Sequence, residues 1–335
     1  MSDAPLRSEP YLLRLGSRLG NGLRGLEPAR REAHRQYLLS QQNDDGGFTG
    51  RIVPDEDDDP DQPPARDSDL YYTSFAVRAM GLLGTFSQDD AERVARYLQA
   101  IGRSSASVID VVSWLYCAVM VQLQGGPDVL ADAPADWPQK LAATLEEFRT
   151  RDGGYAKTRE GAIGSTYHTF LVVLCLELIG QPLPEPDRIV AFLLDRRRDD
   201  GGFVEIAPMK NSGTNPTAAA VAVLTLLDAV TDDVRAGVSE FLRGVRGDDG
   251  GFQANERIPF SDSLSTFTGY LTCLDLGLTD ILGPRQIRKF LAELELKYGG
   301  YRAAIWDNAA DVEYTFYGLG LTALMRQGEA NPPAR

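Results

Sequence analysis

Six side chains that can exchange protons lie at or near the starts of strongly apolar segments of this chain. They are Asp110, His168, Asp262, Asp311, Glu313 and Tyr314. Carboxylates held close together repel one another when ionised, which raises at least one pKa, and a carboxyl group that stays protonated near neutral pH can act as a general acid. A neutral imidazole can serve as the base. The competing interpretation is structural, since aspartate at a helix start is a common N-cap and a lone histidine is commonly a hydrogen-bonded core residue.

A repeated sequence motif predicts how the segments that carry these residues are arranged. Gly-Gly-aromatic occurs at residues 46, 153, 201, 250 and 299, so one spacing is 107 residues and the others are 48 or 49. Because the long spacing is about twice the short ones, a unit near residue 102 lacks the word and the chain contains six units. In each unit an amphipathic segment precedes the word and a much more apolar segment follows it.

The two kinds of segment predict an all-α fold. A helix that is apolar nearly all round is buried, whereas an amphipathic helix faces water. We therefore expect an (α/α)6 toroid, a closed double ring of six inner and six outer helices. An open solenoid is the alternative, but it needs polar capping units that the sequence does not show. The expected domains are an N-terminal extension at 1–27, the six repeats at 28–326 with an acidic loop at 54–69, and a C-terminal tail at 327–335.

Composition excludes several classes of protein. The formal net charge of −14 disfavours a duplex nucleic-acid binder or a polybasic membrane anchor, because both need clustered positive charge. Three widely separated cysteines, Cys117, Cys175 and Cys273, do not suggest a disulfide framework. No apolar run approaches the roughly 20 residues of a membrane span. We expect a cytoplasmic protein.

The six in-phase repeats resemble the β subunits of protein prenyltransferases over residues 28–326, particularly those of the Rab geranylgeranyl transferase type. They resemble more distantly the β domain of squalene-hopene and other class II terpene cyclases. The resemblance implies a lumen that binds an isoprenoid or prenyl diphosphate, with the active site at the rim of inner-helix starts. It also implies a helical partner subunit.

The zinc site that the resemblance implies is expected to be absent. Its words are Asp-x-Cys at the fifth inner helix and x-His-Thr at the sixth, and here they read Asp262-Ser263-Leu264 and Glu313-Tyr314-Thr315. Leucine cannot bind zinc, and tyrosine is a poor ligand beside imidazole or thiolate. We therefore expect no metal ligands in the chain, with Mg²⁺ entering only together with a diphosphate. The Asp-x-Asp-Asp motif of the cyclases matches only residues 55–58, in the acidic loop. We do not expect the catalytic acid of the cyclases at that position.

Substrate-binding residues are expected at the rim and on the inner wall. The resemblance implies basic residues in the loops before the fourth and fifth inner helices, where this chain has Lys210 and Arg257. Alignment of the inner helices on a hydroxyl column (Thr73, Trp114, Thr169, Thr217, Thr266 and Thr315) adds further candidates, which are Tyr72, Tyr167, Asn215, Trp114, Phe267 and Phe316. Aromatic walls can stack along a polyene and stabilise carbocations through their π faces.

Three functions remain open at this point. The first is a zinc-independent prenyl transfer, with Lys210 and Arg257 on the phosphates and a rim carboxylate or His168 as base. The second is an acid-initiated terpene cyclase or isomerase, in which Asp262 or Asp311 is the protonated acid; activity without diphosphate release or divalent metal distinguishes it. The third is a non-catalytic ligand-binding or scaffold toroid that has the barrel without the zinc.

Overall fold

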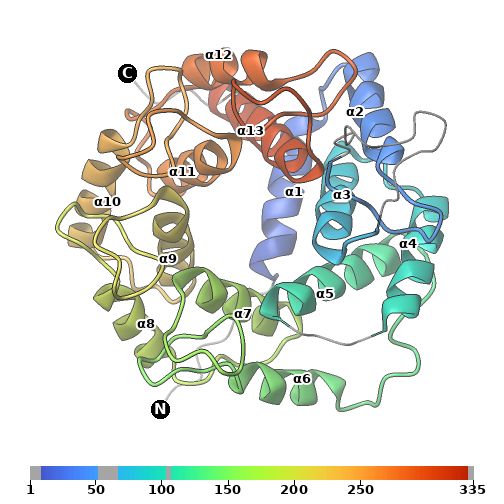
Figure 1. Ribbon diagram of the computed structural model, residues 1–335, viewed down its shortest axis with the longest axis horizontal. Coiled ribbons are helices and arrows are strands. Elements are labelled where there is room, and N and C mark those ends of the chain that lie inside the picture. The colour runs from blue at the N-terminus through green and yellow to red at the C-terminus, as the bar shows by residue number, and fades with distance from the viewer. Residues whose placement is uncertain (1–8, 52–66, 103–106, 331–335) are drawn as a thin grey trace, which may run out of the picture.

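The computed structural model describes residues 9–51, 67–102 and 107–330. Within these ranges the chain forms thirteen α-helices, joined by loops that contain isolated β-bridges. The predicted all-α toroid is confirmed, as Figure 1 shows by the two concentric layers of helices. The inner layer comprises α3 (Leu70–Leu83), α5 (Val108–Leu123), α7 (Thr166–Leu178), α9 (Thr214–Leu226), α11 (Ser263–Asp275) and α13 (Val312–Ala330). The outer layer comprises α2 (Pro28–Ser40), α4 (Gln88–Ile101), α6 (Trp137–Glu146), α8 (Pro186–Asp195), α10 (Asp232–Gly244) and α12 (Pro284–Leu294).

Backbone hydrogen bonds between successive units close the ring. The first amide of an inner helix donates to a carbonyl in the loop of the following unit, as in Thr214 N to Ala254 O at 2.9 Å. The last unit makes the same bond to the first unit, from Val312 N to Gly50 O at 3.0 Å. Because an open solenoid would leave the first and last units apart, this bond excludes that alternative.

The aligned threonines of the inner helices, here called the hydroxyl column, form hydrogen bonds with the Gly-Gly-aromatic motifs. Each threonine Oγ1 accepts from the backbone amide of the aromatic residue of its own unit at 2.9–3.0 Å, and the pairs are Thr73–Phe48, Thr169–Tyr155, Thr217–Phe203, Thr266–Phe252 and Thr315–Tyr301. The Thr169 hydroxyl also donates to the carbonyl of Ser165 at 2.7 Å. Both the threonine and the aromatic residue are buried, so the bond fixes each loop to its inner helix without help from water.

Thr169→Val is expected to lower the free energy of unfolding by about 1–3 kcal/mol, because valine has the same shape but leaves the buried Tyr155 amide without an acceptor. Urea unfolding measures this change. Thr144→Val is the matched control: its hydroxyl donates only to the Lys140 carbonyl near the surface, and we expect a change within about 0.5 kcal/mol. Equal losses in the two variants would contradict the role of the hydroxyl column.

The second unit departs from the predicted alignment. Ser107 is the N-cap of α5, and Asp110 sits three residues later, where its Oδ2 accepts from the Ser107 amide at 3.0 Å. Asp110 is therefore part of a capping box, and the column position of this unit is Val111, not Trp114. The Trp114 indole donates to the Leu98 carbonyl of α4 at 3.4 Å, so the side chain lies between the two layers. Its expected place on the inner wall is wrong, because the unit lacks the Gly-Gly-aromatic word that fixes the alignment elsewhere.

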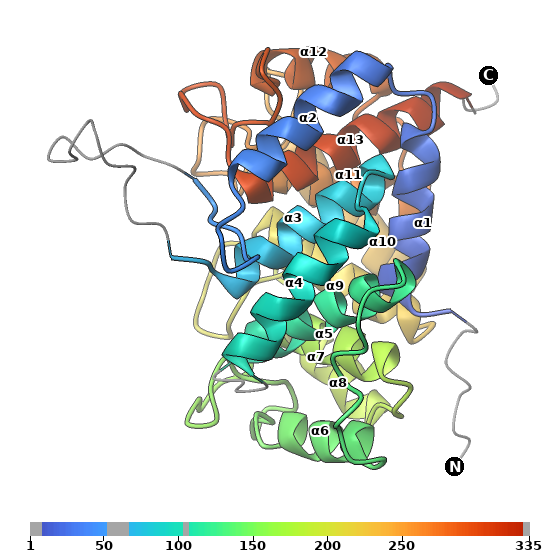
Figure 2. The same cartoon turned by 90° about the vertical axis from the view of Figure 1, so that its right-hand side faces the viewer.

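An additional helix, α1 (Tyr11–Leu23), closes one end of the ring. It packs against α13, α3 and α7 of the inner layer, and Figure 2 shows it at the end opposite the Gly-Gly-aromatic loops. The Tyr11 amide at its start donates to Glu177 of α7 at 2.8 Å. The sequence predicts only an extension outside the repeats for residues 1–27. The opposite end of the chain also differs, since α13 runs on to Ala330 rather than ending before residue 327.

Further predictions concern the cysteines, membrane-spanning segments and the acidic loop. All three cysteines are buried and free, and no helix in the described ranges is long and apolar enough to cross a membrane. Most of the acidic loop, including its Asp-x-Asp-Asp word, lies outside the described residues.

Candidate functional site

Glu313 lies at the loop end of the inner ring, in the first turn of α13. The Tyr71 hydroxyl of α3 donates to its Oε1 at 2.7 Å. Burial raises the pKa of Glu313 to about 7; hydrogen bonds from Tyr71 and Tyr317 oppose the shift, and the charges of Asp311 and Asp262 add to it. A carboxyl group with this pKa is protonated in a large fraction of molecules near neutral pH. It can therefore donate a proton into the ring.

The other two predicted carboxylates, Asp262 and Asp311, flank Glu313. Asp262 caps α11, accepting from the amide and the hydroxyl of Ser265, each at 2.7 Å. Asp311 accepts from the Glu313 amide at 2.8 Å. Burial raises the pKa of Asp311 to about 6 and also raises that of Asp262. The structure thus brings three predicted acids together. Asp262 and Asp311 have the capping geometry, whereas Glu313 accepts from the hydroxyls of Tyr71 on the adjacent helix α3 and Tyr317 on its own helix.

His168 lies in the first turn of α7, and its Nδ1 is 2.7 Å from the Ser165 hydroxyl. The same hydroxyl contacts the Glu205 carboxylate. His168 is only 9% exposed, and its Nε2 has no hydrogen-bond partner among the described residues. Burial and the nearby Lys157 lower the pKa of the imidazole to about 4, so His168 is neutral at pH 7. With Ser165 donating to the carboxylate, Nδ1 carries the proton and the Nε2 lone pair is free to accept one.

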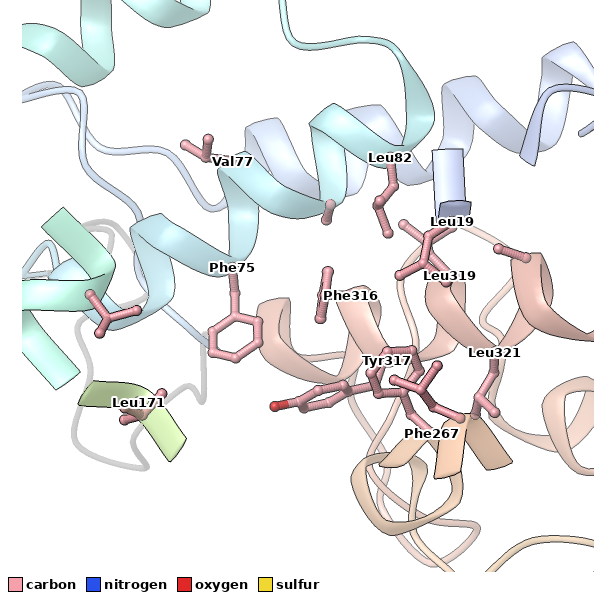
Figure 3. Packing of buried hydrophobic residues seen from close by; sticks show 14 of the residues in the cluster. Leu19, Phe75, Val77, Leu82, Leu171, Phe267, Phe316, Tyr317, Leu319 and Leu321 are labelled. Atoms are coloured by element: carbon pink, nitrogen blue, oxygen red, sulfur yellow. The ribbon is translucent and has the colours of Figure 1, made fainter. Parts of the chain in front are cut away.

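Aromatic rings line the inner face of α3 and α13 below these groups. Phe75 lies 4.8 Å from Tyr71, 5.4 Å from Phe316 and 5.5 Å from Tyr317, measured between ring centroids. Figure 3 shows Phe75 facing Phe316 and Tyr317, with Phe267 of α11 beside them. The structure therefore brings together Phe267 and Phe316, two of the predicted wall residues.

The facing wall, on α9, is made of small side chains. Asn215, Ala218, Ala222 and Thr225 recur at helical spacing and are partly exposed although α9 belongs to the inner layer. Solvent therefore reaches this face of an inner helix. Phe170 and Thr268 on the neighbouring helices are also partly exposed, so together these residues form an accessible part of the inner wall.

Arg78 of α3 is a lumen residue that sequence reasoning missed. Its guanidinium lies 4.5 Å from the Tyr116 ring centroid and 5.3 Å from that of Phe75. No carboxylate pairs with it, and its Nε has no hydrogen-bond partner, within the described ranges. The sequence does contain an indication of this residue, because Arg78 is the single charged residue in the apolar segment LYYTSFAVRAMGLL.

The remaining predicted residues fall into two groups. Tyr72, Tyr167 and Tyr314 stay near the acids, and burial raises the pKa of Tyr167 and Tyr314 to about 12. Asn215 accepts from the Thr268 hydroxyl at 2.7 Å. Lys210 and Arg257 instead lie exposed on adjacent loops, where Arg257 donates to the side-chain oxygen of Asn211 at 2.6 and 2.8 Å. The two cations are neighbours at the rim, outside the buried cluster.

The residues at the zinc words do not fit zinc. Asp262 is occupied as a helix cap, Leu264 offers no ligand atom and Tyr314 replaces the histidine. Within the described ranges no three His, Cys, Asp or Glu side chains converge as a metal-binding group. These side chains do not form a tetrahedral nitrogen and sulfur site.

The chain matches the model of the prenyltransferase alpha-alpha toroid domain over residues 16–123 and 119–331. No curated protein matches it in sequence. Among solved structures it is similar to the protein geranylgeranyltransferase-I of Candida albicans complexed with GGPP. The TM-score is 0.66 at 13% identity, covering 89% of this chain and 91% of that one.

Two further structural neighbours show how widely the fold is used. The type II terpene cyclase MstE from Scytonema has a TM-score of 0.56 at 15% identity and covers 94% of this chain and 99% of its own. The GH76A alpha-1,6-mannanase from Salegentibacter sp. HEL1_6 has a TM-score of 0.57 at 13% identity, covering 93% and 98%. At these identities the neighbours establish the fold alone.

Proposed function

The chain belongs to the prenyltransferase alpha-alpha toroid family, and from this premise we propose that it is an acid-initiated cyclase or isomerase of isoprenoids. The observation that carries the proposal is Glu313. Its pKa of about 7 leaves it protonated in many molecules, and it stands above an aromatic wall that contains Phe75 and Phe316. The type II terpene cyclase MstE, at 15% identity, shares the fold and does not by itself identify the reaction.

The proposed reaction begins with proton transfer from the Glu313 carboxyl to a terminal alkene carbon. The π pair forms the new C–H bond, and the neighbouring carbon becomes a cation. The rings of Phe75, Phe316 and Tyr317, which pack edge to face with one another, are the proposed π systems that stabilise this charge. A further alkene attacks the cation in a cyclisation, and loss of a proton ends the reaction. The product is an isomer of the substrate. The base releases the final proton to water, and Glu313 is reprotonated from water.

His168 is the proposed acceptor of the final proton. It is neutral at pH 7, because burial lowers its pKa to about 4, and its Nε2 is free. A weak base is sufficient here, since a carbocation is a very strong acid. Ser165 and Glu205 hold the ring through Nδ1, which fixes the orientation of Nε2.

Prenyl transfer is the second candidate, and one observation favours it. Lys210 and Arg257 lie on adjacent loops at the rim, where a diphosphate could contact both. They are exposed, however, and they lie apart from the buried acids. The C. albicans transferase supports the fold but, at 13% identity, not the reaction.

Solvent deuterium distinguishes these functions. We expect the protein in D₂O and EDTA to convert farnesol or geranylgeraniol to an isomer that carries one deuterium on carbon, detected by mass spectrometry. The label enters because the Glu313 proton exchanges with solvent. Release of diphosphate from farnesyl or geranylgeranyl diphosphate, with transfer to an acceptor and no isomerisation, would favour prenyl transfer. Absence of any turnover would favour a binding or scaffold role.

A further inference from the structure

We propose that Arg78 and Tyr116, deep in the lumen, bind the anionic end of the substrate, so that the ligand is an isoprenoid acid or phosphate whose head group lies inward. This inference rests on the proposed function, because it places the reactive tail of the same ligand at Glu313. It assigns the substrate class, which the acid alone leaves open.

The position of Arg78 follows from helix geometry. It lies seven residues after Tyr71 in α3, two helical turns on the same face and about 10 Å further from the loops. Phe75 lies between them, 4.8 Å from the Tyr71 ring and 5.3 Å from the Arg78 guanidinium. The inner face of α3 therefore runs from the acid's hydrogen-bond partner, across an aromatic ring, to a cation. An isoprenoid chain with one anionic end has the same order of groups.

The charge of Arg78 is unbalanced in the described structure. The titratable groups that face it are Tyr71, Tyr116, Tyr167, Tyr317 and Cys117, and burial raises the pKa of each, so all five are neutral at pH 7. Arg196 is the contrast: it is 1% exposed, and the carboxylates of Asp152 and Asp195 both contact it. A desolvated guanidinium normally takes such partners. Arg78 makes cation–π contacts, and its buried Nε has no hydrogen-bond partner among the described residues.

Three elements surround the proposed head-group position. Arg78 is partly exposed although it lies inside the ring. The Tyr116 hydroxyl faces α1 at Gly16, where an added Cβ would be in van der Waals contact with the hydroxyl oxygen, at 3.9 Å. The small side chains of α9 are partly exposed on the other side. The anion would therefore lie between α3, α5 and the closing helix α1.

Binding of three ligands with the same chain tests this site. The probes are farnesoic acid, farnesyl phosphate and farnesol, titrated calorimetrically into the full-length protein. We expect the two anions to bind at least tenfold more tightly than farnesol, because hydrogen bonds to charged groups are among the stronger ones. The tighter of the two anions identifies the head group as carboxylate or phosphate.

Arg78→Met should abolish the preference for the anions and leave farnesol affinity within twofold. It should also unfold at the same or a higher temperature than the native protein, because it removes an unpaired charge from the lumen. Arg96→Met is the control, since it makes the same substitution at an exposed position of the outer helix α4. We expect it to keep the preference. If Arg78→Met does not fold, Arg78→Lys keeps the charge without the planar fork and should weaken anion binding at least threefold.

The outcomes separate this inference from the proposed function. Equal affinity for all three probes, or a preference that survives in Arg78→Met, would overturn the anion site while leaving acid chemistry at Glu313 intact. Anion binding that depends on Arg78, without any isomerisation of the bound probes, would establish the site and refute the proposed reaction. Failure of all three probes to bind would overturn both.

Discussion

Glu313→Gln is expected to reduce isomerisation of an isoprenoid at least a hundredfold. Glutamine has the size of glutamate and can still accept from the Tyr71 hydroxyl, but it cannot donate an acidic proton to an alkene. General acid catalysis contributes about 10²–10⁴-fold to rates, so this loss is the largest that a single isosteric change should produce here. The measurement is the rate of deuterium incorporation from D₂O under saturating substrate.

The pH dependence of the native enzyme follows from the same group. Only the protonated carboxyl is active, and its pKa lies near 7. We therefore expect the turnover rate to fall tenfold for each unit as the pH rises above about 7. In Glu313→Gln, the residual rate should not show this fall. A native rate that is flat between pH 6 and pH 9 would exclude Glu313 as the acid.

At pH 8, Glu313→Gln should raise stability although it lowers activity. The pKa of Glu313 in the folded state is raised above its unfolded value of about 4.5, so the folded protein binds this proton more tightly. Its contribution to stability is present in full below about pH 4.5 and is lost as the pH rises to about 7 and beyond. Glu313→Gln should consequently melt at a higher temperature than the native protein at pH 8. Glu240→Gln, at an exposed position of α10, should change neither property.

The architecture could be predicted because its determinants are periodic and local. Five Gly-Gly-aromatic words fix the frame of five units, and apolar periodicity separates the two layers. The starts of inner helices then share one rim, which is why Asp262, Asp311 and Glu313 could be placed together. In the second unit the word is absent, and the alignment went wrong by three residues at Asp110 and Trp114.

What could not be predicted depends on contacts between distant parts of the chain. The Tyr11 amide of α1 bonds to Glu177, and nothing in an amphipathic N-terminal segment indicates that it closes a ring. Arg78 lies in the middle of α3, whereas the predicted polar site residues all lie near the starts of inner helices. The packing of the five other inner helices decides whether Arg78 faces the lumen and whether a carboxylate lies beside it.

Gly299→Ala is expected to open the junction between the last and first units. Gly299 has φ +95°, and a Cβ placed on it would lie 2.2 Å from the Ala33 carbonyl oxygen in α2. The left-handed conformation costs alanine about 1–2 kcal/mol, and overpacking typically adds about 1–3 kcal/mol. We expect a loss of roughly 2–5 kcal/mol in the free energy of unfolding. Gly125→Ala controls for backbone strain, because Gly125 has φ +73° with no atom within 4 Å of a Cβ, and should lose only about 1–2 kcal/mol.

Hydrogen exchange locates the damage and connects it to the site. In Gly299→Ala the Val312 amide, which bonds to Gly50 across the junction, should exchange faster, while the Thr214 amide, in the equivalent bond within the ring, should not. Uniform acceleration, or equal destabilisation by Gly125→Ala, would contradict a local role. Glu313 follows Val312 directly and bonds to Tyr71 on the first inner helix, so the proposed acid pair spans the same junction. Any variant that loosens the closure should therefore also separate Glu313 from Tyr71 and lower the activity.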